Sequence, residues 1–337
     1  MSKLYKLSRY VYLQPKAFAQ RGRLLAPEHY RELSGARNLS DALKALSTTV
    51  YGDVLRGAGD PREMEGKLYD HYSDFVEPLR ASAPRPLRDL LGHYLLEMEV
   101  ENIKLLAARL VRGLDLESVL PYLYLRAEEH LRRRDFIAEL ASAAEVSGFV
   151  GALVRHGVLS PEEGELVGGH LRAGDILPLA VLLDLKYYRE FLRLVGRFRG
   201  GERRMLLEVV GPRIDAAVVK SVYRLKEWGA GELLGSFAVG RCFRIRYADI
   251  VGLGPEEVLK VAAAAYSCEA ELESVERAAM AEGFRRANSA FLKGLLTSVP
   301  VVAVVELKRY EVANLVTILR GLSLGLVGKE LEGLVIR

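Results

Sequence analysis

Apolar residues recur every three to four positions along almost the whole 337-residue chain, and this periodicity is the strongest constraint on its fold. Each of the segments DALKALSTTVYGDVL, LGHYLLEMEVENIKLLAARLV and EVLKVAAAAYSCEAELESVERAAMAEGF places an apolar stripe along one side of a helix. Alternation of apolar and polar residues, which is typical of strands, is rare. Its one short example, RCFRIRYADI at 241–250, is interpreted as a linker. We therefore predict an all-α protein.

Helix starts are also visible in the sequence. Ser160 precedes Pro161 and two glutamates, the pattern of an N-cap followed by proline at the first helical position and acids in the first turn. The segment GLGPEEVLK at 252–260 repeats the Gly-Pro-Glu-Glu start. We expect helices to begin at Pro161 and Pro255.

One polar motif interrupts the apolar stripe of helices that lie far apart in the chain. The stretches EVENIKLLAARLVRG and EVANLVTILRGLSLG both carry a glutamate, an asparagine three residues later, and a glycine eleven residues after the asparagine. A more divergent copy, RIDAAVVKSVYRLKEWGAGELL, has an aspartate at the acidic position and Val218 at the asparagine position. The residues assigned to this structural repeat motif are Glu99, Asn102, Gly113, Asp215, Arg224, Gly229, Glu311, Asn314, Arg320 and Gly325.

The spacing of the motif copies indicates how the chain is organised. Each copy reads as a helix, a glycine that ends it, and a short following helix. The copies are about a hundred residues apart, which is too long for a short-repeat solenoid. We therefore predict three similar helical bundles, at residues 1–125, 126–240 and 241–337.

The acid of each copy is the feature that needs an explanation. It projects inside the apolar stripe, so Glu99, Asp215 and Glu311 are expected to be at least partly buried. A buried carboxylate must be paired or hydrogen-bonded, and the asparagine one turn away can share its network. The acid could be catalytic or bind an ion, or it could be a polar clamp that fixes helix register. We favour the clamp, because an active site needs one unique constellation whereas a clamp is needed once per structural unit.

The sequence does not contain the motifs that several kinds of catalytic, metal-binding and nucleotide-binding site require. The histidines end at His170 and the cysteines begin at Cys242, so neither an HExxH zinc helix nor a Cys/His or Ser/His/Asp arrangement can be assigned. A GxxxxGK[ST] phosphate loop is also missing. Cys242 and Cys268 are interpreted as buried thiols, with a bridge as the minor alternative. We expect no catalytic residue, no metal site and no cofactor. Apolar runs fall short of the roughly 18 residues that a membrane span needs.

The motif helices carry a resemblance to a known family. Together with RGRLLAPEHYREL, DALKALSTTVYGDVL and the tail YEVANLVTILRGLSLGLVGKELEGLVIR, they make the chain resemble the C subunit of A/V-type ATP synthases, the counterpart of the d subunit of eukaryotic V-type ATPases. That family has a D/E-x-x-N-[IL] helix, often followed by an arginine and a glycine. The last copy here fits the whole pattern. The middle copy departs from it at Val218, and the first has Arg109 one position after the expected arginine.

The resemblance implies an all-helical, funnel-shaped fold with pseudo-threefold internal repetition. It also implies a mechanical, non-catalytic role as a socket or spacer in the rotor, between the central-stalk subunits and the membrane proteolipid ring. Such a part transmits torque for proton or other ion transport coupled to ATP synthesis or hydrolysis, and it binds no nucleotide. We expect a peripheral protein at the cytoplasmic face of the cell membrane, without a membrane span, monomeric when isolated, and with mainly polar interfaces.

Two other classes of function stay open at the level of sequence. One is an all-helical scaffold protein unrelated to ATPases. The other is a nucleic-acid-binding helical protein that uses the basic runs Arg132–Arg134 and Arg197–Arg204. The net charge of +4 is only a mild excess spread along the chain, and we favour solvated helix ends for both runs, because cations favour helix C-termini. Nucleic-acid binding needs aromatic side chains for stacking, and the nearby ones are Tyr187, Tyr188 and Phe198. An enzyme has the weakest support.

Overall fold

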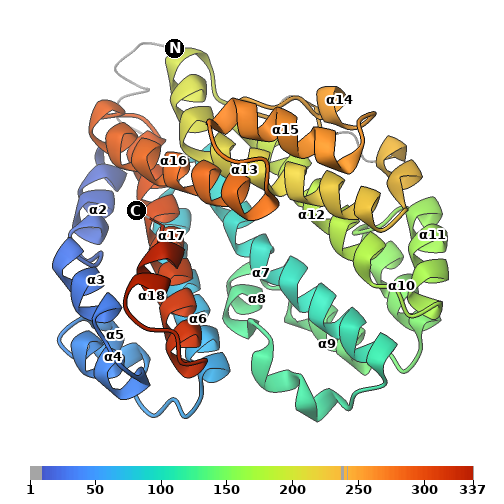
Figure 1. The fold of residues 1–337 in the computed structure, drawn as a ribbon, viewed down its shortest axis with the longest axis horizontal. Helices are drawn as coiled ribbons and strands as arrows, with labels where there is room; N and C mark the ends of the chain where they lie inside the picture. The colour runs from blue at the N-terminus through green and yellow to red at the C-terminus, as the bar shows by residue number, and fades with distance from the viewer. Residues whose placement is uncertain (1–9, 237–238, 241, 337) are drawn as a thin grey trace. The chain divides into compact units, whose positions relative to one another are not determined.

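The computed structural model describes residues 10–236, 239–240 and 242–336, and every regular element within these ranges is a helix (Figure 1). The prediction of an all-α protein is confirmed. The segment interpreted as a linker is an irregular connection that leads into the single turn α14 (Tyr247–Ile250). Residue 241, where the third predicted bundle begins, lies outside the described residues.

The chain forms two compact units. Unit 1 consists of Met1–Leu91, Phe198–Val210 and Met280–Arg337, and unit 2 of Gly92–Arg197 and Gly211–Ala279. Most of the boundaries fall inside three long helices: α7 (Arg85–Arg112), α13 (Gly200–Glu227) and α16 (Leu272–Lys293). The first two motif copies belong to unit 2 and the third to unit 1. The division into three bundles stays a prediction.

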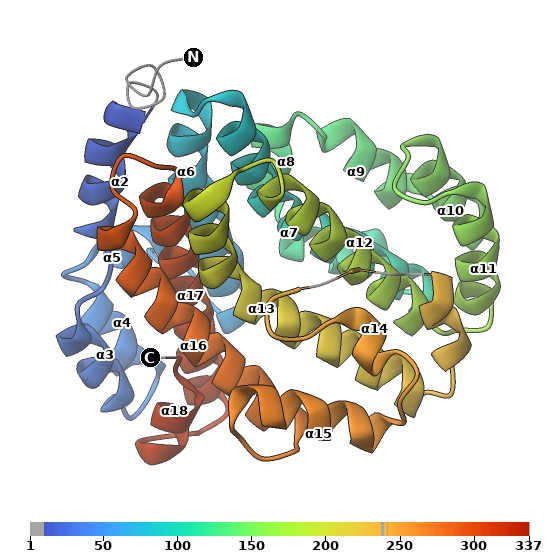
Figure 2. The same ribbon diagram turned by 90° about the horizontal axis from the view of Figure 1, so that it is seen from above.

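Unit 1 is built around α17 (Val299–Ser323), which carries the third motif copy. It packs against α2 (Leu13–Arg21), α4 (Leu39–Leu46), α6 (Pro61–Ser82) and α18 (Lys329–Leu334). The short helices α3 (Pro27–Ser34) and α5 (Val50–Val54) pack beside α4 and α6. The apolar run at the start of α17 is fully buried, so helices from the two ends of the chain share one core (Figures 1 and 2).

Unit 2 is built largely from helices that pack against their neighbours in the sequence. Two short 3-10 turns, η1 (Leu116–Ser118) and η2 (Leu120–Tyr122), follow α7. The next helices pack on one another in order: α8 (Leu125–Leu131), α9 (Arg134–Ser142), α10 (Val146–Arg155), α11 (Pro161–Arg172) and α12 (Leu177–Val195). A third 3-10 turn, η3 (Gly231–Ser236), follows α13, and α15 (Pro255–Tyr266) packs on α14.

The expected helix starts are confirmed. The Ser160 hydroxyl accepts a hydrogen bond from the Glu163 amide at 3.2 Å, and the Glu163 carboxylate accepts one from the Ser160 amide at 2.7 Å. Proline at the first position needs no amide partner, and so α11 begins at Pro161. At the start of α15, the Gly254 amide donates to the Glu257 carboxylate at 2.9 Å.

The length and hydropathy of the helices show whether any of them could span a membrane. In the part of the chain that the structure describes, none is both long enough and apolar enough to cross a bilayer.

Candidate functional site

The three motif acids are all buried, each on a long helix. Glu99 on α7 is 5% exposed, Asp215 on α13 is 0% exposed and Glu311 on α17 is 3% exposed. A carboxylate in such surroundings is costly unless donors surround it. Each acid has donors from segments outside its own helix, and Glu311 also has one on its own helix, Lys308.

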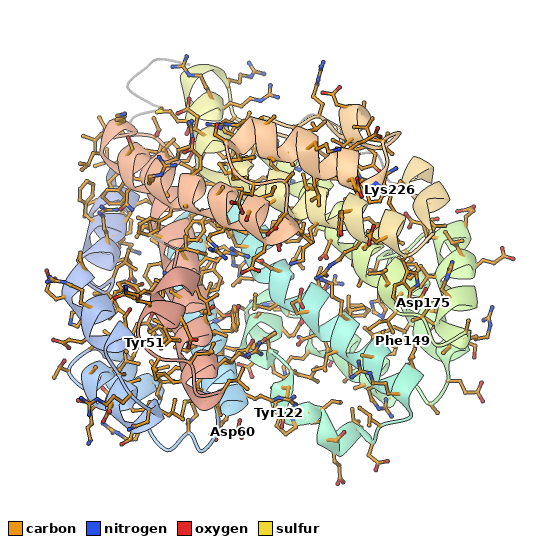
Figure 3. The ribbon with its side chains drawn as sticks, viewed as in Figure 1. Tyr51, Asp60, Tyr122, Phe149, Asp175 and Lys226 are labelled. Atoms are coloured by element: carbon orange, nitrogen blue, oxygen red, sulfur yellow. The ribbon has the colours of Figure 1, made fainter. Side chains whose placement is uncertain are left out.

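Glu311 receives three donors in unit 1. One carboxylate oxygen accepts hydrogen bonds from the Tyr51 hydroxyl at 2.5 Å and the Lys308 ammonium group at 3.0 Å. The other accepts a bond from the backbone amide of Leu25, in the connection between α2 and α3. Tyr51, on α5, is labelled in Figure 3. The acid therefore holds two N-terminal segments against α17.

The neighbours of Glu311 are electrostatically coupled to it. Lys308 is buried one turn before the acid and also donates to the Tyr51 hydroxyl, at 2.7 Å. Burial lowers the pKa of Lys308, although the charge of Glu311 opposes that shift. Burial, and then the charge of Glu311, raise the pKa of Tyr51 well above its usual value. Tyr51 thus stays a neutral donor to the carboxylate.

Asp215 holds a loop rather than a helix. Its two oxygens accept hydrogen bonds from the backbone amides of Phe243 at 2.9 Å and Arg244 at 2.8 Å. The Tyr266 hydroxyl, from α15, donates to the second oxygen at 2.7 Å. Burial raises the pKa of Asp215, while these donors oppose the shift. The acid fixes the connection that precedes α14 against α13.

Glu99 belongs to a pair of buried acids. It forms an ion pair with Arg133, at the start of α9. Glu128 on α8 is fully buried, and one of its oxygens accepts a hydrogen bond from the Asn102 side chain at 2.9 Å. Burial raises the pKa of Glu99, and burial together with the charge of Glu99 raises the pKa of Glu128 to about 8. Glu128 is therefore the protonated member of the pair at neutral pH.

The two motif asparagines hold the backbone in the same way. The Asn102 amide oxygen accepts from the Tyr124 amide at 2.8 Å, and its nitrogen lies 3.4 Å from the Tyr124 carbonyl oxygen. Asn314 makes the corresponding pair of bonds with Ile336, at 2.8 and 2.9 Å. In both cases the partner lies 22 residues further along the chain. Val218 in the middle copy offers no such side chain.

The motif glycines end their helices in one conformation. Gly113, Gly229 and Gly325 have φ angles of 62°, 76° and 85°, a left-handed region that favours glycine. In each case the glycine amide bonds to the carbonyl three residues before it, and the next amide bonds to the carbonyl five residues before itself. These are the two bonds of a Schellman helix end.

The motif arginines do not form a common feature. Arg320 lies against Glu65 on α6, and Arg224 is exposed on α13. Arg109 in the first copy donates to the carbonyl oxygens of Leu114 at 3.1 Å and Ala141 at 3.0 Å. Only the first and last copies therefore use an arginine to join two segments.

Two further kinds of site, a reactive thiol and a metal centre, would need the cysteines or a cluster of metal-ligating side chains. Cys242 and Cys268 are free thiols. Cys242 is buried, as predicted, but the prediction is wrong for Cys268, which is half-buried because it lies in the connection between α15 and α16. Burial raises the pKa of Cys242 well above its usual range, which disfavours the reactive thiolate. Among the described residues, no group of three or more histidine, cysteine, aspartate or glutamate side chains could hold a metal ion.

The aromatic side chains considered for nucleic-acid stacking are not accessible. Tyr187, Tyr188 and Phe198 are all buried. In the first basic run, Arg133 is paired with Glu99, and Arg134 is paired with Glu129 at 3.0 Å. A stacking platform of the kind that single-stranded nucleic acids require is therefore not formed by these residues.

Removal of the Glu311 carboxylate tests the clamp. We expect Glu311→Ala to lower the free energy of unfolding by roughly 1–3 kcal/mol, because the buried Tyr51 and Lys308 and the half-buried Leu25 amide lose their acceptor. Glu330→Ala, at an exposed position of α18, is the matched control and should change stability by less than about 0.5 kcal/mol. Urea denaturation measures both, and equal midpoints for the two variants would contradict the clamp.

The raised pKa of Glu128 predicts a pH dependence of stability. Between its ordinary value of 4.5 and its folded value of about 8, the folded protein keeps a proton that the unfolded chain releases. Stability therefore falls as pH rises through this window, at most by about 1.4 kcal/mol per pH unit. Glu128→Gln mimics the protonated acid and should weaken this dependence. Urea denaturation at pH 5 and pH 8 would show a variant that gains stability relative to the wild type at pH 8.

The exposed neighbour supplies the control for that experiment. Glu129 is exposed and paired with arginines, so Glu129→Gln should leave the pH profile unchanged. If the Glu128→Gln variant and the wild type lose stability in parallel between pH 5 and pH 8, Glu128 does not hold the proton.

Comparison with known proteins extends the similarity over nearly the whole chain. The family model for the ATP synthase (C/AC39) subunit matches residues 13–333. Three relatives are each named as the C subunit of an A-type ATP synthase. The Methanocaldococcus jannaschii protein is 22% identical over 98% of this chain and 87% of its own. The Methanothermobacter thermautotrophicus protein is 23% identical over 92% and 83%. The Haloferax volcanii protein is 25% identical over 94% of both.

Proposed function

Since the chain belongs to the ATP synthase (C/AC39) subunit family, we propose that it is a non-catalytic rotor subunit of an A/V-type ATP synthase. In this role it is a socket or spacer that links the central-stalk subunits to the membrane proteolipid ring and transmits torque between them. The observation that carries the proposal is the family match across residues 13–333. The protein would then be peripheral, at the cytoplasmic face of the membrane, and would couple ion movement to ATP synthesis or hydrolysis.

The buried clamps support a mechanical role. A part that transmits torque must resist the separation of its helices. Here Glu311 joins α17 to the segments of Leu25 and Tyr51, more than 250 residues away in sequence. Asp215 joins α13 to the loop at Phe243. Bonds that close such long loops remove conformational freedom that the chain would otherwise have.

The hydrogen bonds that already surround the acids support a non-catalytic role. A general acid or base needs a free position toward its substrate. The oxygens of Asp215 and Glu311 already accept bonds from three donors each. Their surroundings resemble those of structural clamps rather than those of reactive carboxylates.

The recurrence of local geometry supports a threefold repeat. All three motif helices end in the same Schellman bonds at a left-handed glycine. The two asparagine clamps both span 22 residues. We infer that the motif copies mark three related bundles, at residues 1–125, 126–240 and 241–337, with N-terminal helices completing the core around the last copy.

The proposal is tested by reconstitution of the rotary complex. Omission of this chain should leave ATP hydrolysis by the soluble catalytic head intact and abolish ATP-driven ion transport, because the stalk and the ring lose their connection. Addition of the purified chain should restore transport. High salt should slow its reassembly, since exposed charge pairs weaken as ionic strength rises. Full ion pumping by a complex shown to lack this chain would contradict the proposed role.

A further inference from the structure

Leucine side chains are exposed at the end of α16 and in the turn that joins it to α17, in unit 1. Leu292 is 64% exposed, Leu295 52% and Leu296 44%, and we name these three residues the leucine turn. Singly exposed apolar side chains are ordinary, but several large ones within five residues form a patch that calls for a partner. The patch differs from the mainly polar interfaces expected from the sequence.

The neighbouring helix adds to this apolar surface. Phe18 on α2 packs edge-on against Phe291 with ring centroids 4.7 Å apart, and Arg21 donates to Asn288 at 3.0 Å. These contacts join α2 to the last turns of α16, and the two helices cross there (Figures 1 and 2). Phe18, which touches Phe291 next to Leu292, is itself 41% exposed, and Tyr12 at the start of α2 is 69% exposed.

The turn has a fixed backbone. Leu296 adopts a φ of 63°, a conformation that leucine rarely takes and that persists only where the surroundings impose it. Gly294 is buried, and a Cβ atom there would meet Val299 at 2.5 Å. The leucine side chains are thus held outward by a close-packed turn rather than by a loose loop.

Cations lie next to the leucine turn. Lys293, the last residue of α16, is exposed next to Leu292. Arg199, just before α13, and Arg203 and Arg204 near its start are exposed as well. We name these four residues the basic rim. The start of α13 is joined to the end of the turn, because Glu202 accepts hydrogen bonds from the Ser298 amide at 2.9 Å and hydroxyl at 2.6 Å. The rim also has an acidic neighbour in Glu208, whose carboxylate lies 3.9 Å from Arg204.

The combination has the chemistry of a lipid-facing surface. Apolar and aromatic side chains beside lysine and arginine favour the boundary between headgroups and acyl chains, and the cations favour anionic lipids. Side chains that project from a turn suit a fluid apolar phase, which adapts to them, whereas a protein partner must offer a shaped pocket. We propose that the leucine turn and the basic rim dock directly on an anionic lipid bilayer. This contact goes beyond the proposed link between stalk and ring.

Vesicles without protein test the proposal independently of any other part of the ATPase. The purified full chain should sediment with vesicles of equal parts phosphatidylglycerol and phosphatidylcholine at low salt. It should bind vesicles of phosphatidylcholine alone about tenfold or more weakly, because the cations lose their counter-charge. Added salt should release it from the anionic vesicles.

Paired variants separate the two parts of the surface. Leu295→Ser with Leu296→Ser should weaken binding about tenfold or more through lost apolar burial, and Arg203→Gln with Arg204→Gln should do so through lost charge. The controls are Leu324→Ser with Val327→Ser, beyond the opposite end of α17, and Arg56→Gln on an exposed turn. Both controls should bind as the wild type does. Circular dichroism and thermal melting check that every variant is folded.

The outcomes decide between occupants of the surface. A wild type that binds neither kind of vesicle, or turn variants that bind as tightly as the controls, would overturn the proposal. If the turn variants fail only to join a proteolipid ring while protein-free vesicles never bind, the occupant is a protein and the lipid proposal is also overturned. Loss of vesicle binding without loss of rotor assembly, or the reverse, distinguishes this proposal from the rotor function.

Discussion

A carboxylate inside an apolar helix face must be surrounded by donors, and much of this structure follows from that constraint. The helix that carries the acid cannot supply them all, because its own amides are bonded within the helix. The donors therefore come from other segments: the backbone amides of Leu25, Phe243 and Arg244, and the hydroxyls of Tyr51 and Tyr266. Each acid thereby selects which connection lies against its helix.

The asparagines extend the same principle to neutral groups. Asn102 and Asn314 each offer one acceptor to the backbone N–H, and one donor to the backbone C=O, of a residue beyond the glycine helix end. The glycine reverses the chain, and the asparagine fixes where the reversed segment returns. A helix, its end and the returning chain are thus held as one piece, and this stiffness suits the torque-bearing role proposed for the chain.

Part of this arrangement could be predicted from the sequence. Apolar periodicity indicated the helical class, proline and acid patterns indicated the starts of α11 and α15, and the helical wheel placed the three acids on apolar faces. A wheel shows which face is buried but not what covers it. The donors to Asp215 include backbone amides, which nearly every residue has, so no side-chain pattern marks Phe243 or Arg244. The asparagine clamps did leave a signal, the equal spacing to Tyr124 and Ile336, but that signal is visible only once the partners are known.

Hydrogen exchange measures most directly whether the buried acids hold the connections in place. The amides of Leu25, Phe243 and Arg244 lie outside long helices, yet each donates to a buried carboxylate. If the clamps are as described, these amides exchange as slowly as the helix amides around them, and Glu311→Ala releases Leu25 but leaves Phe243 protected. Exchange of all three amides as fast as that of Gly57, in an exposed turn, would contradict the account.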